Sequence, residues 1–224
     1  MSCRQRVKIC GISDPRSAEV AVEAGADYIG VVFYPGSHRY VDPDQAREIA
    51  EVARTSSGAE QTQVVGLFVN EPLDYVLRVR EDIGLDVLQL SGNESAGYMS
   101  ELRSRGISFI ATVRASDDST DQARDRFDEI VESQPYAVHL DTHVSGLWGG
   151  SGVVGDWELA REFAQRYRLF LAGGLDPGNV YDAVCEVRPY VADVSSGVET
   201  EKKKDHAKIR AFIAAARGTE GDER

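Results

Sequence analysis

The stretch VKICGISDPRSAEVAVEAGADYIGVVF, residues 7–33, contains one complete unit of the pattern that decides the fold. It begins with an apolar run over 7–10 and ends with another over 28–33, each short enough for a buried strand. Between them lies an amphipathic run that starts with Asp14 and a proline, a residue pair typical of a helix start. Gly25 follows that run, where a helix commonly ends in a left-handed residue. The stretch therefore predicts a strand, a helix and a second strand.

The same alternation of short apolar and longer amphipathic runs continues along the whole chain. Eight apolar runs predict strands over 7–10, 28–33, 64–69, 87–90, 109–113, 137–140, 169–172 and 191–194. Eight amphipathic runs predict helices over 15–24, 43–53, 73–83, 95–105, 120–132, 157–167, 177–187 and 206–217. Asp-Pro pairs at 14–15, 42–43 and 176–177 support the starts of three of these helices.

Eight such units in 224 residues favour an α/β protein with a single closed (β/α)8 barrel, or TIM barrel, over an open doubly wound sheet. The length and the hydrophobic content of 42% are enough for one sizeable core. We therefore expect one domain over residues 1–217. The polar residues 218–224 are expected to form a disordered tail.

The composition excludes several classes of protein. The formal net charge is −12, and so acidic a surface repels the phosphate backbone of nucleic acids. No apolar run reaches the roughly 18 residues of a membrane span, and residues 1–10 lack the apolar core of a signal peptide. The cysteines Cys3, Cys10 and Cys185 form neither an even disulfide set nor a Cys-x-x-Cys pair. We expect a soluble cytoplasmic protein without nucleic-acid or membrane partners, and the sequence leaves open whether it is a homo-oligomer.

Lysine is scarce in this chain. Only five of the 25 basic residues are lysines, and four of these lie after residue 200. Many carboxylates beside few lysines suit a salt-rich cytoplasm, because carboxylates hold water and salt screens their mutual repulsion. The pattern indicates a halophilic protein, with an ordinary acidic protein as the alternative.

The functional site of such a barrel lies at the C-terminal ends of its strands. Cys10 ends the first predicted strand, and Lys8 lies two residues earlier on the same face. An ammonium group beside a thiol favours the thiolate, which makes Cys10 a candidate reactive group. The alternative is a small buried hydrophobic residue, the common state of a free cysteine.

Asp141 ends the sixth predicted strand, ahead of the glycine-rich segment 149–152. A carboxylate at this place acts either as a general acid or as a cap for the following turn. His139, Asp141 and His143 also alternate as in a two-histidine, one-carboxylate metal site. A turn at Thr142 would break that geometry, and we expect neither a metal nor a cofactor.

Glycine-rich turns follow the last two predicted strands, as Gly173-Gly174 and Ser195-Ser196-Gly197. These two loops build the phosphate site of many barrels, because uncovered backbone N–H groups bind anions. Together they predict a phosphorylated small-molecule ligand, contacted by Gly173, Gly174, Ser196 and Gly197.

Arg39 follows the second strand and is a candidate for binding a substrate carboxylate through two parallel hydrogen bonds. The alternative for Arg39 is an ion pair on the surface. The run Lys202 to Lys204 is expected to be solvated.

Taken together, these segments resemble the phosphoribosylanthranilate isomerase family of tryptophan biosynthesis. The resemblance covers nearly the whole chain, and the motifs that carry it are Lys8-Ile9-Cys10-Gly11-Ile12, Gly25-Ala26-Asp27, Gly30-Val31-Val32-Phe33-Tyr34-Pro35, Ser37-His38-Arg39-Tyr40, Gly66-Leu67-Phe68-Val69-Asn70, Leu140-Asp141-Thr142, Gly149-Gly150-Ser151-Gly152, Asp156-Trp157, Ala172-Gly173-Gly174-Leu175 and Asp193-Val194-Ser195-Ser196-Gly197-Val198-Glu199.

The resemblance implies a cofactor-free Amadori rearrangement of an N-glycosidic aminoaldose to an aminoketose. It implies that Cys10 is the general base, that Asp141 is the general acid and that Arg39 holds the anthranilate carboxylate. The chain departs from the family pattern at Ser91, where a histidine is usual, and at Val153-Val154-Gly155. Two alternatives remain: a metal-dependent sugar-phosphate epimerase with His139, Asp141 and His143 as ligands, and a phosphate-binding barrel that has lost turnover through these departures.

The charge pattern generates a prediction about salt. At 0.01 M salt the Debye length is about 30 Å, so the carboxylates of a small acidic barrel repel one another, whereas about 1 M salt shortens it to about 3 Å. We expect the melting temperature to rise along a potassium chloride series from dilute buffer to molar salt. A midpoint that stays flat would contradict the halophilic interpretation.

Overall fold

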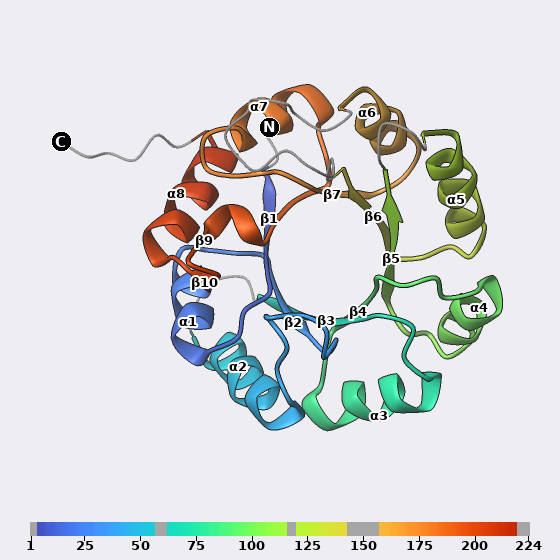
Figure 1. Cartoon of the computed structure of the whole chain (residues 1–224), viewed down its shortest axis with the longest axis horizontal. Helices are drawn as coiled ribbons and strands as arrows, with labels where there is room; N and C mark the ends of the chain where they lie inside the picture. The colour runs from blue at the N-terminus through green and yellow to red at the C-terminus, as the bar shows by residue number, and fades with distance from the viewer. Residues whose placement is uncertain (1–3, 57–61, 116–119, 143–156, 219–224) are drawn as a thin grey trace.

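The barrel predicted from the sequence is present in the computed structural model, which describes residues 4–56, 62–115, 120–142 and 157–218. Eight parallel strands form one closed sheet in chain order, with the last strand paired to the first (Figure 1). They are β1 (Arg6–Cys10), β2 (Tyr28–Val32), β3 (Gln63–Phe68), β4 (Val87–Leu90), β5 (Phe109–Arg114), β6 (Ala137–Asp141), β7 (Leu169–Ala172) and β8 (Val191–Val194).

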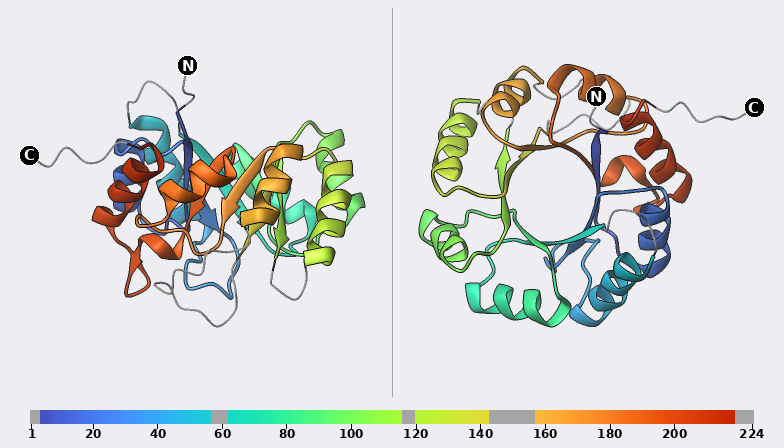
Figure 2. Two further views of the ribbon diagram at one scale, coloured as in Figure 1. Left: turned by 90° about the horizontal axis from the view of Figure 1, so that it is seen from above. Right: turned by 180° about the vertical axis from the view of Figure 1, so that it is seen from behind.

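Eight α-helices alternate with the strands and surround the barrel as an outer ring (Figure 2). They are α1 (Pro15–Glu23), α2 (Pro43–Thr55), α3 (Leu73–Ile83), α4 (Ala96–Ser104), α5 (Thr120–Glu132), α6 (Trp157–Arg166), α7 (Val180–Val187) and α8 (His206–Ala216). Asp14 and Asp42 cap the first two helices as predicted, each accepting a hydrogen bond from a backbone N–H of the first turn. No helix within the described ranges is long and apolar enough to cross a membrane.

The start of α7 differs from the prediction. The Asp-Pro pair predicted a helix from Pro177, but α7 begins at Val180. The Asp176 carboxylate accepts hydrogen bonds from the backbone N–H groups of Gly178 and Asn179, so it stabilises a turn before the helix.

Side chains alternate between the two faces of each strand, as the period of a strand requires. On the outer face, residues such as Ile9, Val31 and Leu140 are fully buried against the helices. On the inner face, the N-terminal half of the barrel is filled by a separate apolar cluster. Its buried members are Tyr28, Val65, Val87, Ile110, Ala137, Phe170 and Val191.

Above this apolar floor, the inner face becomes polar. Lys8 of β1 and Asp193 of β8 are register partners across the seam that closes the barrel. Lys8 Nζ donates to Asp193 Oδ2 at 2.7 Å, and the side chains are 0% and 2% exposed. A fully buried ion pair therefore spans the seam between β1 and β8, beneath the C-terminal end of the barrel.

Three short elements between β8 and α8 were not predicted. They are the 3-10 helix η1 (Ser196–Val198) and the strands β9 (Glu199–Thr200) and β10 (Lys203–Lys204). The two strands form an antiparallel hairpin, in which Lys204 is the register partner of Glu199. This hairpin brings both side chains to the rim of the barrel.

Candidate active site

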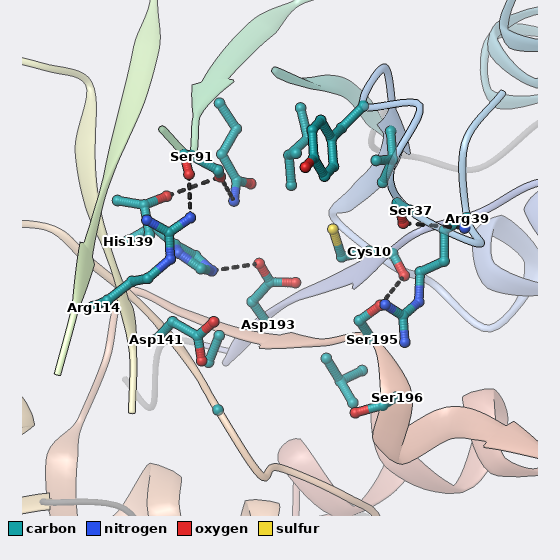
Figure 3. A pocket seen from close by; sticks show the side chains of 18 of the residues that line it. Cys10, Ser37, Arg39, Ser91, Arg114, His139, Asp141, Asp193, Ser195 and Ser196 are labelled. Atoms are coloured by element: carbon teal, nitrogen blue, oxygen red, sulfur yellow. Dashed lines mark hydrogen bonds and ion pairs between the residues drawn. The ribbon is translucent and has the colours of Figure 1, made fainter. Parts of the chain in front are cut away.

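A cavity of about 550 Å³ opens at the C-terminal ends of the strands, where the sequence placed the site. Every strand of the barrel, or the loop that follows it, contributes to its lining (Figure 3). The polar side chains around it are Cys10, Tyr34, Ser37, Arg39, Gln89, Ser91, Thr112, Arg114, His139, Asp141, Asp193, Ser195 and Ser196.

Cys10 lies at the end of β1 with its side chain in the cavity. Cys10 is only 8% exposed, as expected for a buried cysteine. Its side chain nevertheless lines the cavity and does not pack in the apolar core. Lys8 lies on the same inner face, and both Cys10 Sγ and Lys8 Cε lie beside Gly30, at 3.0 and 3.3 Å from the place of a Cβ atom on that glycine. Burial lowers the pKa of Lys8, but Asp193 and Cys10 oppose this and leave that pKa raised above its ordinary value.

Two side chains contact the same oxygen of Asp193. Its Oδ2 accepts from Lys8, and it lies 3.2 Å from Nε2 of the buried His139 on β6. Burial raises the pKa of Asp193, but the charge of Lys8 and the hydrogen bond from His139 outweigh it and lower that pKa. Asp193 is therefore an anion whose charge the protein itself balances.

Asp141 ends β6, two residues after His139 and on the same face. Both side chains line the cavity, and in Figure 3 Asp193 lies between Asp141 and Cys10. His143, the third member of the alternative metal site, lies outside the described residues. Within the described ranges no cluster of three or more His, Cys, Asp or Glu side chains could hold a metal ion.

Arg39 reaches the cavity from the loop after β2, but its guanidinium group already has a partner. Nε and Nη2 donate to the two oxygens of Glu199, at 2.6 and 2.9 Å. A Cβ atom on Gly11 would lie 2.4 Å from Arg39 Cδ, so the arginine crosses the end of β1 only because residue 11 is glycine. The ion pair that was the alternative for Arg39 exists, yet it lies at the wall of the cavity rather than on the outer surface.

Glu199 is shared between two cations. Lys204 Nζ donates to Glu199 Oε1 at 2.8 Å, and the Lys204 side chain is only 1% exposed. The prediction that Lys204 is solvated is therefore wrong, although Lys202 and Lys203 are exposed. Burial opposes ionisation of Glu199, but hydrogen bonds from Arg39 and Lys204 dominate and lower its pKa to about 2.

The two glycine-containing loops lie next to each other at the cavity. Gly173, Gly174 and Ser196 line it, whereas Gly197 packs behind them, where a Cβ atom would approach the Leu175 carbonyl oxygen to 1.9 Å. Nothing lies within 4 Å of the place that a Cβ atom on Gly174 would occupy. The loops therefore approach each other closely and leave their cavity side open.

Gln89, Arg114, Glu199 and Lys204 were not predicted as site residues. Gln89 and Arg114 could have been found, because they lie on the inner face at the ends of β4 and β5, where the strand period places them. Glu199 and Lys204 follow η1 and belong to no predicted element, so no periodicity marked them.

Ser91 stands at the departure from the resembled pattern and belongs to a local polar network. Its hydroxyl lies 3.0 Å from Thr112 Oγ1 and accepts from Gln89 Nε2 at 3.2 Å, while its carbonyl oxygen accepts from Arg114 Nη2. Val153-Val154-Gly155, the second departure, lies outside the described residues together with the segment 149–152.

Comparisons with known proteins identify the family of this chain. A family model described as N-(5'-phosphoribosyl)anthranilate (PRA) isomerase matches residues 7–215. The N-(5'-phosphoribosyl)anthranilate isomerase of Roseiflexus sp. (strain RS-1) is 44% identical over 213 residues, which cover 94% of this chain and 97% of that one. The crystal structure of phosphoribosylanthranilate isomerase from Thermotoga maritima superposes with a TM-score of 0.82 at 39% identity, covering 96% and 99% of the two chains. A structure of that enzyme type in complex with reduced 1-(o-carboxyphenylamino)-1-deoxyribulose 5-phosphate gives a TM-score of 0.80 at 37% identity, with the same coverage.

Proposed function

This chain belongs to the N-(5'-phosphoribosyl)anthranilate isomerase family of tryptophan biosynthesis, and we propose that Cys10 and Asp141 carry out its isomerisation as general base and general acid. The substrate would be N-(5'-phosphoribosyl)anthranilate and the product 1-(2-carboxyphenylamino)-1-deoxyribulose 5-phosphate. One observation carries the assignment of roles: a single cavity contains a thiol, a carboxylate, an arginine and two open glycine loops. These groups match the proton acceptor, proton donor, carboxylate and phosphate contacts that the reaction requires.

The acid step opens the sugar ring. Asp141 delivers its proton to the ribose ring oxygen while the bond between C1′ and that oxygen breaks. The lone pair of the anthranilate nitrogen forms a double bond to C1′, which gives a protonated Schiff base. Protonation by a positioned carboxyl group is typically worth about 10²- to 10⁴-fold in rate.

The base step moves the hydrogen at C2′. The positive Schiff base makes this hydrogen acidic, and the Cys10 thiolate removes it. The electrons of the C–H bond form a double bond between C1′ and C2′ and neutralise the nitrogen. The resulting enolamine takes a proton at C1′ and loses the one on its 2′-hydroxyl, which leaves the ketone.

Lys8 supports the base in this scheme. Its ammonium group is held by Asp193 at 2.7 Å and faces Cys10. A fixed positive charge beside a thiol favours the thiolate form. The buried ion pair thus serves the reaction as well as the closure of the barrel.

Substrate hydroxyl groups need acceptors, and the cavity wall supplies two. Gln89 Oε1 and Asp193 Oδ1 are buried and have no hydrogen-bond partner among the described residues. A buried acceptor without a partner costs about 1 to 3 kcal/mol, so a hydroxyl donor from the ligand is favoured there. We assign the phosphate group to the loops with Gly173, Gly174, Ser196 and Gly197, and the anthranilate carboxylate to Arg39.

The proposed overall reaction is tested by mixing purified protein with N-(5'-phosphoribosyl)anthranilate and following the loss of its anthranilate-type fluorescence. We expect the protein to convert the substrate at a rate that a metal chelator does not change. Chelator-sensitive epimerisation, or binding without turnover, would instead support one of the two alternatives from the sequence.

Replacing the base gives the sharpest test of its role. Cys10→Ser should abolish turnover while leaving product-analogue binding nearly intact, because a serine hydroxyl is far less acidic than a thiol and supplies no anion near neutral pH. Cys185→Ser, at an exposed cysteine on α7, is the matched control and should behave like the parent. Substantial turnover by the Cys10→Ser variant in steady-state kinetics would overturn the assignment.

The acid is tested in the same way. Asp141→Asn keeps the shape of the side chain but has no proton to deliver, so kcat should fall by about 10²-fold or more. The exposed Asp182 on α7 provides a matched control as Asp182→Asn. If Asp141→Asn turned over at the parental rate, ring opening would depend on a different acid.

Arg39→Ala removes the proposed contact to the substrate carboxylate. A charge-assisted hydrogen bond is worth roughly 1.5 to 3 kcal/mol, so kcat/KM should fall about ten- to a hundredfold with a raised KM. Arg47→Ala, which breaks an exposed ion pair on α2, controls for the loss of one arginine. If Arg39→Ala had the same kinetics as this control, Arg39 would only form the ion pair with Glu199 and would not bind the substrate.

A further inference from the structure

Lys204, at the end of β10, is a buried lysine that has no role in the proposed proton transfers. The hairpin of β9 and β10 turns through Glu201 and Lys202, which both have positive φ, of 51° and 63°. Positive φ at both central residues is the conformation of a tight hairpin turn, although glycine or asparagine is usual there. This turn sets Lys204 opposite Glu199 and points it inward, while its neighbour Lys203 stays exposed.

The ammonium group of Lys204 connects two loops of the site. Nζ donates to the Ser195 carbonyl oxygen and to Glu199 Oε1, each at 2.8 Å, and lies 3.4 Å from Ser195 Oγ. Glu199 in turn holds Arg39 through two hydrogen bonds. Ser195 Oγ donates to the Cys10 carbonyl oxygen at 3.1 Å. Two short chains of hydrogen bonds therefore run from Lys204, one to the arginine and one to the backbone of the cysteine.

The positive charge of Lys204 also interacts with the negative charge of a Cys10 thiolate. Burial is the largest effect on Lys204 and leaves its pKa below the ordinary value, while the hydrogen bond to Glu199 and the negative charge of a Cys10 thiolate partly offset it. Coupling between two sites is reciprocal, so a charged Lys204 favours the thiolate by the same amount as the thiolate favours the ammonium group. The other titratable and charged groups around this pair are Lys8, His38, Arg39, Arg114, His139, Asp141, Asp193, Glu199 and Lys208.

We infer that Lys204 is a positioning residue for the isomerisation, which orients Arg39 through Glu199 and favours the thiolate of Cys10. The inference rests on the proposed roles of Cys10 and Arg39. The contact with Glu199 also joins the two strands of the hairpin, but a lysine that only closed the hairpin would not need the hydrogen bond to the Ser195 carbonyl oxygen. Of the two buried lysines at the site, Lys8 acts from the barrel interior and Lys204 from the rim.

The experiment compares Lys204→Gln with Lys203→Gln, a neighbouring exposed lysine, in a chain that also carries Cys3→Ser and Cys185→Ser. Iodoacetamide then reports on Cys10 alone, and its rate is measured from pH 5 to pH 10. Lys204→Gln should slow alkylation at pH 7 about tenfold and move its half-maximal rate to higher pH. Lys203→Gln should match the parent, and Lys204→Arg should restore most of the alkylation rate because it keeps the charge.

Steady-state kinetics on the same variants test the link to Arg39. Lys204→Gln should lower kcat/KM about ten- to a hundredfold, with KM raised as in Arg39→Ala. Lys204→Met keeps the aliphatic stem and gives the same comparison if the glutamine variant does not fold.

A folded neutral variant with the alkylation profile and KM of Lys203→Gln would overturn the inference. Alkylation measures the thiol whether or not Cys10 is the base. An active Cys10→Ser variant would therefore refute the proposed base separately, without changing how Lys204 affects the thiol.

Discussion

The ion pair between Lys8 and Asp193 is the constraint on which both the barrel and its site depend. It lies in the barrel interior at the seam between β1 and β8, with both side chains buried. Removing one partner of such a pair typically costs about 3 to 5 kcal/mol, because an uncompensated charge stays buried. The same register pairs Ile9 with Val194, and Ser195 directly follows the end of β8. The hydrogen bond from Ser195 Oγ to the Cys10 carbonyl oxygen follows from the same alignment.

Each strand serves two purposes along its length. Its outer residues pack against the helices and its inner residues close the floor, where Tyr28 and Phe170 meet edge to face at 5.2 Å. Only the C-terminal residues of the inner face are free for chemistry. Gly30 shows how tightly this upper layer is packed, since a Cβ atom there would lie 3.0 Å from Cys10 Sγ and 3.3 Å from Lys8 Cε. The apolar floor thus stabilises the barrel, and the upper layer can carry charges that would otherwise be costly.

The fold could be predicted from the sequence because the two periods, of strand and helix, are local signals. The same periods placed Cys10 and Asp141 at strand ends, and their side chains do line one cavity. The network of Arg39, Glu199 and Lys204 could not be predicted. It depends on a hairpin whose turn residues lack the usual glycine or asparagine, and on contacts between residues about 160 positions apart. The predicted start of α7 at Pro177 was wrong, because Asp176 stabilises a turn that precedes the helix.

The chain has a serine at position 91, where the family pattern has a histidine, and this removes one titratable side chain from that side of the cavity. A histidine gains and loses a proton near pH 6.5, whereas a serine hydroxyl stays neutral over the same range. The neighbouring cation is Arg114, whose side chain donates to the Ser91 carbonyl oxygen and whose charge is permanent. The groups that β4 and β5 present to the cavity, Gln89, Ser91, Thr112 and Arg114, therefore keep one charge state across neutral pH. Under the proposed mechanism, the proton transfers then involve Cys10 on β1 and Asp141 on β6, where Asp141 is the register partner of Arg114.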